Sequence, residues 1–505
     1  MPGSCRPCSR GRRCATKSVM VAPHGIIRCM IVKLPPILPQ KCGIHLRTFL
    51  FALLFFLMSA CGAGGKPPSE GLPTPKASIT PKGTALPTAP PKASPTPEST
   101  ATPRVAVSAL EGVQVPLWHL LPDKWLRGPV ARFNRENPWG IEVVPRAFPD
   151  EAALTDALPE ASPGTVLLGY PRWESPDNLS DLTPWLNDPH YGMPAEEQAD
   201  FFETFWDEGW EGETLLTLPL LRSAAFLARN HTWAAELGYP AIPQDVSAFQ
   251  AQACAANAAL RGDDDVYNDG LGGWVVDTRP PVMLGWLYAF GAPLTADGTY
   301  RFDTPEGETA FGFLKALFDE NCAWVGEEAY PDAYFSARQA LFVSATLSDL
   351  PFLEQAFAEA GSRDHWGALP FPSAPGEEPA LPTFGPSFGM LRGADEAHSL
   401  AGWLFMRWML SPDVLADLAR QSGYLPVRRA ALDALADYGA LHPAWQAVAE
   451  ALPYARPEPS LPSWSAVQWV LQDAGEQVFR SYFTADRITE TLQLLEETAN
   501  SLAAP

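Results

Sequence analysis

The chain of 505 residues is 46% hydrophobic and 11% aromatic, which is enough for one large or two medium folded domains. It carries 58 acidic and 36 basic residues, a net charge of −22. Residues 1–60 hold nine of the basic residues and none of the acidic ones, so the remainder carries −31. A surface this acidic disfavours nucleic acid and anionic lipid as partners.

An apolar run of 12 residues, Phe49–Ala60, directly precedes a cysteine. It is too short to span a bilayer, which takes about 20 residues. Lys41 and Arg47 come before it and small residues end it, which is the pattern of a secretory signal. With Cys61 next, the segment resembles the lipobox of bacterial lipoproteins, whose cysteine is lipidated and becomes the mature N-terminus. An ordinary cleaved signal followed by an unrelated cysteine is the alternative.

The segments on either side of Cys61 are interpreted from their composition. We expect residues 1–60 to be a leader that ends in the signal peptide, with an over-long first part and the true start at Met20 or Met30. From 62 to 104, Pro, Thr, Ser and Ala dominate, and such a segment cannot bury a core. We therefore expect residues 61–112 to form an extended tether between a membrane-anchored Cys61 and a folded domain.

The folded domain is expected over residues 113–500, where strand-like and helix-like patterns alternate. The first expected elements are strands at 112–120, 141–148 and 165–170 and a helix at 125–137. Further helical patterns occupy 232–260, 305–320, 335–360, 394–421, 428–450 and 463–500. This alternation predicts an α/β fold with largely parallel sheets. The domain is long for one doubly wound sheet, so two lobes are expected.

Several segments follow one another in a characteristic order: VARFNRENPWGIEVV (130–144), LSDLTPWLND (179–188), the stretch 214–250, the stretch 288–324, and the segment that ends in GYLPV (423–427). Within 288–324, Thr304 suits a helix N-cap, Pro305 the first turn, and Glu306 the positive end of the helix dipole. Together these segments resemble the extracellular solute-binding proteins of ABC importers, particularly the carbohydrate-binding group related to maltose-binding protein. The resemblance covers roughly residues 113–500.

The resemblance implies a two-lobed periplasmic-binding-protein-like fold of type II, with the ligand in a cleft between the lobes. Lobe 1 is expected at about 113–220 and 367–420, and lobe 2 at about 221–366 and 421–500. It further implies a monomeric, extracytoplasmic subunit that captures a solute by lobe closure and delivers it to a membrane permease. No enzyme activity, cofactor or metal is expected.

The ligand is expected to be a sugar, with one departure from the family pattern. The family often has Gly-Ser-Trp where this chain has Ala345, Thr346 and Leu347, so a usual sugar-stacking tryptophan is missing. Polyols, glycerol-phosphate esters, peptides and polyamines therefore stay open as ligands.

Sugars are bound by aromatic faces and by polar groups that reach their hydroxyls, usually in loops at the ends of strands. On this basis the candidate ligand-binding residues are Trp118, Tyr170, Trp173, Arg222, Ser223, Asp277, Arg279, Thr346, Ser348, Phe384, Ser387 and Trp464. For each of them, ordinary packing or surface pairing is the alternative.

Two further features leave alternatives open. Cys254 and Cys322 could pair in an oxidising compartment or remain two separate buried thiols. GPSFG at 385–389 fits the nucleophile pattern of a serine hydrolase, with Ser387 followed by Asp413 and His442. One competing function is thus a secreted lipoprotein hydrolase that uses Ser387. The other is a ligand-sensing protein without a transporter.

Overall fold

The computed structural model describes residues 105–169, 176–328 and 330–503. Cys61, Tyr170 and Trp173 lie outside the described residues, so the predictions made for them have no structural counterpart here. None of the helices in the described ranges combines the length and the apolar character that a bilayer crossing requires.

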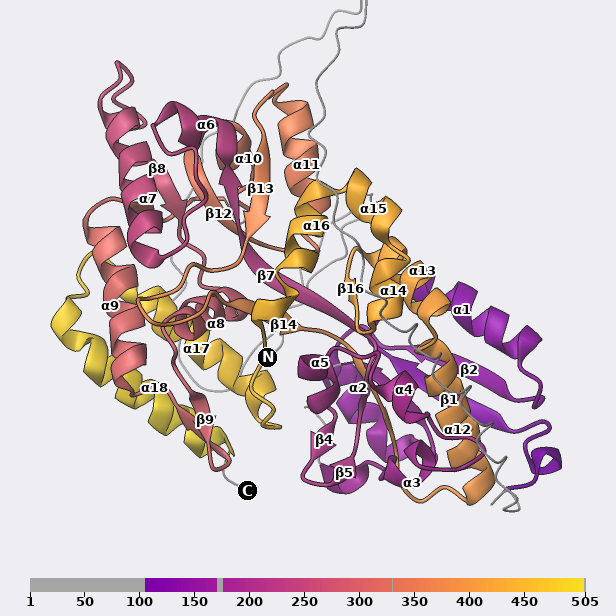
Figure 1. Ribbon diagram of the computed structural model, residues 1–505. Coiled ribbons are helices and arrows are strands. Elements are labelled where there is room, and N and C mark those ends of the chain that lie inside the picture. Colours follow the sequence, from indigo (N-terminus) through magenta and orange to yellow (C-terminus); the bar gives the residue numbers. More distant parts are fainter. Residues whose placement is uncertain (1–104, 170–175, 329, 504–505) are drawn as a thin grey trace, which may run out of the picture. The chain divides into compact units, whose positions relative to one another are not determined.

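Strands and helices are interspersed along the chain, and in places several strands or several helices follow one another directly (Figure 1). The first half contains η1 (Val107–Ala109), β1 (Gln114–His119), α1 (Asp123–Glu136), β2 (Glu142–Ala147), α2 (Glu151–Ala157), η2 (Leu158–Glu160), β3 (Val166–Gly169), η4 (Pro176–Asn178), α3 (Thr183–Leu186), α4 (Ala195–Gln198), α5 (Glu203–Asp207), β4 (Trp210–Glu211), β5 (Thr214–Leu215), β6 (Leu218–Pro219), β7 (Leu221–Asn230), α6 (His231–Glu236), α7 (Val246–Arg261) and β8 (Gly272–Val275).

The second half contains α8 (Pro280–Ala289), β9 (Leu294–Ala296), β10 (Thr299–Arg301), α9 (Pro305–Asp319), β11 (Ala323–Trp324), α10 (Asp332–Ser336), β12 (Ala340–Thr346), α11 (Leu350–Glu359), β13 (Trp366–Leu369), β14 (Leu381–Phe384), β15 (Ser387–Met390), α12 (Glu396–Met409), α13 (Pro412–Ser422), β16 (Leu425–Pro426), α14 (Arg429–Asp433), α15 (Ala436–Leu441), α16 (Pro443–Glu450), η5 (Leu452–Tyr454), β17 (Ala455–Pro457), α17 (Trp464–Val478), η6 (Ala485–Arg487) and α18 (Ile488–Ala503).

The first sheet has five strands in the order β2-β1-β3-β15-β6. β1 is parallel to β2 and β3, whereas β15 runs antiparallel to β3 and β6. α1 covers β2 with one apolar face, because Leu126, Val130 and Phe133 recur at helical spacing and are all buried. α12 covers β1. These elements form lobe 1.

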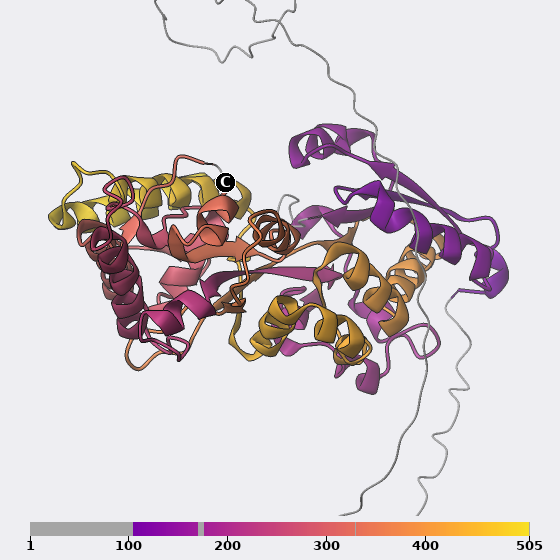
Figure 2. The ribbon, with the colours of Figure 1, turned by 90° about the horizontal axis from the view of Figure 1, so that it is seen from above.

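The second sheet has the order β11-β8-β12-β7-β14-β17, and β13 and β16 also pair with β7. β11, β8 and β12 are parallel, whereas β7 is antiparallel to β12. The carboxyl ends of the three parallel strands therefore meet at one edge, where ligands bind in open α/β sheets. α9, α17 and α18 pack together in this lobe, lobe 2, and Figure 2 shows them away from the first sheet.

The long strand β7 joins the two lobes (Figure 1). Its first residues, Leu221 and Arg222, pair with β16, and its later residues pair with β12 and β13. β6, just before it, belongs to the first sheet, and the backbone N–H of Leu220 between them donates to the Pro386 carbonyl at 3.0 Å. The outward crossover at Leu220 and the return crossover at 385–386 are thus hydrogen-bonded to each other.

At residue level, one local expectation is met and one alternative that the sequence left open is decided. The Thr304 side chain accepts the backbone N–H of Gly307, and Pro305 opens α9, as its sequence predicts. Cys254 in α7 and Cys322 just before β11 are joined by a disulfide, with a Cα–Cα distance of 4.3 Å. Within the described ranges, the only group of three potential metal ligands is these two cysteines with Glu320, and both sulfurs are already bonded to each other.

Three expectations need correction. Residues 105–112 are not tether, because Val105 and Leu110 are buried in the core and the Tyr191 hydroxyl donates to the Val105 carbonyl. Residues 367–384 belong to the second sheet through β13 and β14, so the chain returns to lobe 1 only at 385–386. The helical pattern at 335–360 is interrupted by the fully buried strand β12, whose continuous apolar run has no strand-like alternation.

Candidate functional site

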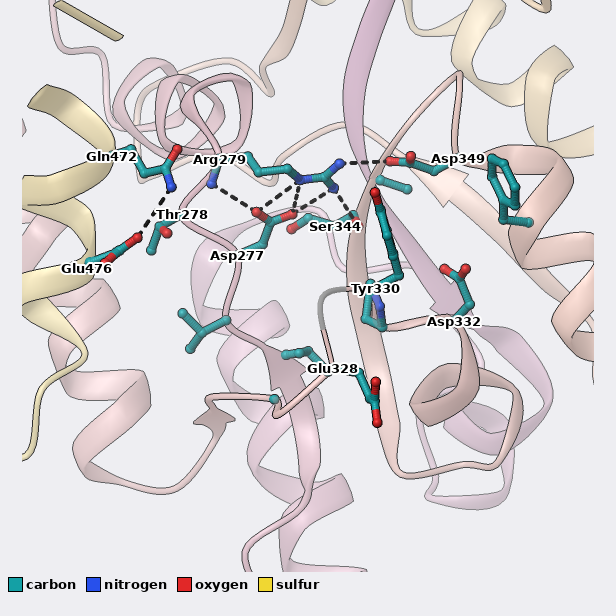
Figure 3. Close-up of a pocket in the computed structure, with 16 residues that line it drawn as sticks. Asp277, Thr278, Arg279, Glu328, Tyr330, Asp332, Ser344, Asp349, Gln472 and Glu476 are labelled. Carbon is teal, nitrogen blue, oxygen red and sulfur yellow. Dashed lines mark hydrogen bonds and ion pairs between the residues drawn. The ribbon is translucent and has the colours of Figure 1, made fainter. Parts of the chain in front are cut away.

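A cavity of about 380 Å³ opens at the carboxyl ends of β11, β8 and β12 (Figure 3). Each parallel strand supplies part of its wall. The loop after β8 gives residues 276–279, and β12 with its following loop gives Ser344, Ala345 and Asp349. The segment after β11 gives Gly326, Glu328 and residues 330–332. α17 closes one side with Gln472 and Glu476. The cavity therefore lies where the topology of the second sheet predicts a ligand.

Arg279 is the centre of the polar contacts in the cavity (Figure 3). Its guanidinium pairs with Asp277 on one side, at 2.8 Å, and with Asp349 on the other, at 3.0 Å. The backbone N–H of Arg279 also donates to the Asp277 carboxylate, which fixes the turn that leads into α8. Partial burial acts to lower the pKa of Arg279, but the charges of Asp277 and Asp349 outweigh it and raise this pKa above its ordinary value.

Asp349 connects this pair to the backbone of the neighbouring loop. One of its carboxylate oxygens accepts from Arg279 and also from the backbone N–H and the hydroxyl of Thr346, at 2.8 and 3.1 Å. The loops after β8 and β12 are thus held together by a single carboxylate. Such a network fixes the cavity wall before any ligand arrives.

The remaining lining groups are mostly acidic or aromatic. Glu328, Asp332 and Glu476 add three carboxylates to the two that hold Arg279. Burial raises the pKa of Asp332, the charge of Asp349 raises it further, and Arg279 acts in the opposite direction. Tyr330 and Phe352 are 70% and 60% exposed. Exposed aromatic faces beside polar groups are what a binding site for a small polar molecule requires.

A protein-family model described as bacterial extracellular solute-binding protein matches residues 129–451, more than half of the chain. This chain is a member of the bacterial extracellular solute-binding protein family. The predicted resemblance to extracellular solute-binding proteins and the predicted two-lobed α/β fold class are thereby confirmed. A search of curated protein sequences finds no significant match.

Solved structures with the same fold include several binding proteins. The sugar-binding protein MalE from Xanthomonas citri is 19% identical with a TM-score of 0.66, and the match covers 77% of this chain and 97% of that one. The cyclic alpha-maltosyl-1,6-maltose binding protein from Arthrobacter globiformis is 18% identical (TM-score 0.63, coverage 77% and 99%). UgpB from Mycobacterium tuberculosis, in complex with glycerophosphocholine, is also 18% identical (TM-score 0.61, coverage 77% and 98%). At this identity the comparisons establish the two-lobed fold.

Four predicted ligand residues lie at or next to the cavity of this solute-binding protein. Asp277 and Arg279 line it, as their position after a strand predicts. Thr346 is buried behind Asp349 and acts through that carboxylate. Ser348 points instead to Tyr424, with 3.3 Å between the two hydroxyl oxygens.

A second set of predicted residues lies at the crossovers between the lobes. Arg222 is buried and its guanidinium pairs with Glu208. Ser387, in β15, is also buried and its hydroxyl accepts a hydrogen bond from Arg222. Phe384 in β14 pairs with Ser223 in β7, whose buried hydroxyl has no partner among the described residues.

The geometry around Ser387 does not assemble a hydrolase triad. The carboxylate of Asp413 pairs with Arg132 at 2.8 Å, and the His442 ring faces the carboxylate of Glu354, at 3.8 Å. Ser387 receives a hydrogen bond from a guanidinium rather than giving one to a histidine.

Two predicted tryptophans are in the interior. Trp118 in β1 is 7% exposed and packs on Phe148, with ring centroids 5.0 Å apart, while the Arg146 guanidinium covers both rings. Trp464, the first residue of α17, is 2% exposed and lies near Tyr300 in the core of lobe 2. Neither residue lines the cavity at the ends of β8, β11 and β12, so a ligand role for either stays a prediction.

The cavity also contains residues that the sequence reading did not select: Glu328, Tyr330, Asp332, Ser344, Asp349, Gln472 and Glu476. One signal was available for the first three. GEEAYPD follows the short apolar segment that becomes β11, so it is a post-strand loop like the one that carries Asp277. Gln472 and Glu476 had no such signal, because an i, i+4 pair on a helix is usually solvent-exposed.

Proposed function

We propose that the chain is the extracytoplasmic substrate-binding subunit of an ABC importer and that the cavity at β8, β11 and β12 is the lobe 2 half of its solute site. One observation carries the assignment: in a member of a solute-binding family, the strand-end edge of lobe 2 holds a pre-organised polar cavity. The solute enters between the lobes, and the lobes close on it. The closed form then docks on membrane permease subunits as a monomer.

The solute class is proposed from relatives of the same fold. MalE is described as a sugar-binding protein, and the structure of UgpB contains glycerophosphocholine. A sugar and glycerophosphocholine are both small polar molecules. The cavity of about 380 Å³ is large enough for one or two sugar-sized units. A sugar or a sugar-like solute is the proposed cargo.

The location is proposed from the first part of the sequence. Residues 49–60 have the pattern of a secretory signal, and Cys61 stands where a lipoprotein is lipidated. The Pro-rich stretch after it would then serve as a spacer to the folded domain. A lipid anchor of this kind keeps the binding domain near its permease while leaving its lobes free to move.

Thermal denaturation of the full-length chain with a solute panel tests the function. The panel contains mono- and oligosaccharides, polyols, amino acids and polyamines. A solute at 100 times its dissociation constant should stabilise the fold by about 2.7 kcal/mol, which raises Tm by a few degrees. The shift should shrink in Asp349→Asn, which weakens the bridge between the two cavity loops.

Two outcomes would contradict the proposal. One is a panel in which no solute raises Tm. The other is hydrolysis of an ester substrate that is abolished by Ser387→Ala, since a binding protein should keep its solute affinity in that variant. The second result would favour the hydrolase alternative.

A further inference from the structure

We infer that the solute held in this cavity carries a protonated amine, on a sugar-like or an aliphatic body. The inference rests on the proposed function, because it concerns the chemistry of the same site. It narrows the proposed sugar-like cargo to cationic solutes.

The charge of the cavity wall is the first argument. Five carboxylates line the cavity, from Asp277, Glu328, Asp332, Asp349 and Glu476, and the only cationic side chain among its lining residues is that of Arg279. Arg279 is already shared between Asp277 and Asp349. Glu476 pairs with Arg480 outside the cavity lining, at 3.5 Å, so Glu328 and Asp332 are the lining carboxylates without an ion pair among the described residues. A neutral solute would leave their charge uncompensated, and an anionic solute would add to it.

The acidic groups come from separate elements rather than from one acidic segment. The loop after β8 gives Asp277, the loop between β11 and α10 gives Glu328, α10 begins with Asp332, and the loop after β12 gives Asp349. α17 adds Glu476. Each of the three neighbouring parallel strands thus delivers at least one carboxylate to the same cavity. A solvated acidic surface loop would not produce this convergence.

Two of the carboxylates are free to meet a ligand. Among the described residues, no hydrogen-bond donor or cation contacts the side chains of Glu328 and Asp332. Asp332 is also partly buried, and its pKa is raised by that burial and by the charge of Asp349, against the opposite effect of Arg279. A ligand ammonium near Asp332 would offset both effects.

The spacing of the carboxylates favours an organic cation over a metal ion. Within the described part of the chain, no three carboxylates of this cavity bring oxygens within 4.8 Å of one another. A metal ion needs several oxygens at about 2–2.6 Å, so these groups are too far apart to share one. An amine on a larger body can meet one or two of them. The exposed rings of Tyr330 and Phe352 can also receive an ammonium through cation–π contact.

Matched pairs of solutes test the inference on the full-length chain by isothermal titration calorimetry. Glucosamine is compared with glucose, and putrescine with 1,4-butanediol, at neutral pH and low salt. At least one amine should bind about tenfold more tightly than its neutral counterpart or more, and the difference should shrink as salt is added. The inference is overturned if glucose and 1,4-butanediol bind as tightly as their amine counterparts. It is also overturned if glucose binds and neither amine does. Either result leaves the proposed function intact.

A matched pair of variants places the effect in the cavity. Asp332→Asn removes one free lining carboxylate, whereas Glu327→Gln removes a charge from the same segment at a position that does not line the cavity. Asp332→Asn should weaken amine binding about tenfold, and Glu327→Gln should change it less than about twofold. Tm without solute should be similar for both variants. Equal amine affinities for the two variants would overturn the inference.

Discussion

The guanidinium of Arg222 is buried at the point where the chain passes between the lobes. It forms a two-point pair with Glu208, at 3.1 and 3.2 Å, and donates to the Leu221 and Pro386 carbonyls and to the Ser387 hydroxyl. Arg222→Ala leaves the Glu208 carboxylate, which is only 11% exposed, without this cation. We expect it to lower the free energy of unfolding by about 3–5 kcal/mol, measured by urea denaturation.

Arg132→Ala is the control for the Arg222 prediction. Arg132 pairs with two carboxylates, those of Glu136 and Asp413, but it is 40% exposed, so its removal should cost far less stability. If Arg222→Ala instead keeps normal stability and loses solute affinity, the prediction is wrong and Arg222 is a ligand contact.

Single residues also show how far the sequence could predict the site. Asp277 and Arg279 were selected because they follow a strand, and both line the cavity. Arg222 was selected near the first crossover and Trp464 after a Pro-rich segment, and both are buried. Residue type alone does not distinguish a ligand contact from a buried pair or a core ring, because both use the same chemistry. Asp349 was missed since its role depends on loops that are distant in sequence.

At the scale of elements, the disulfide between α7 and the segment before β11 closes a long chain loop. Its cysteines are 68 residues apart, which corresponds to about 4 kcal/mol of stabilisation in the chain-entropy view. Cys254→Ser should therefore lower Tm by several degrees. Reducing agent should lower Tm of the parent protein in the same way and leave the variant unchanged. An equal response of parent and variant to the reducing agent would show that the cysteines are not paired in solution.

Elements with one apolar face were predictable, whereas two longer elements that are buried on nearly all sides were not. α1 shows apolar residues at helical spacing, and its residues were predicted as a helix. α8 is buried on nearly all sides and β12 completely so, and neither shows a period that distinguishes helix from strand. The mixed direction of both sheets was also hidden, because strand direction depends on β7 and β15, which were not predicted.

At the scale of the whole binding domain, the chain crosses between the two lobes at Leu220 and at 385–386. Residues 427–429, just after β16, are still hydrogen-bonded to lobe 1 at Asp200 and Phe202. The sequence predicted a division into lobes but placed the return to lobe 1 at 367. The sequences of β13 and β14 do not indicate which lobe they belong to, because the sheet of either lobe could accept a short apolar strand. Their pairing with β7 decides it.

The crossovers predict how the molecule responds to its solute. Crossovers of this kind act as hinges, so a solute that contacts both lobes gains its second set of contacts only in the closed state and shifts the population toward it. We expect the radius of gyration, measured by small-angle X-ray scattering, to fall as solute is added. Its midpoint should match the dissociation constant from calorimetry, because one equilibrium controls both quantities.

A non-binding solute of similar size is the control, since it changes solvent contrast without occupying the site. The result that would contradict closure is full calorimetric binding with an unchanged radius of gyration. In that case the contacts of lobe 2, at Arg279 and the free carboxylates beside it, would hold the solute without help from lobe 1. Solute binding would then give a permease no conformational signal, and delivery would depend on the affinity of the cavity alone.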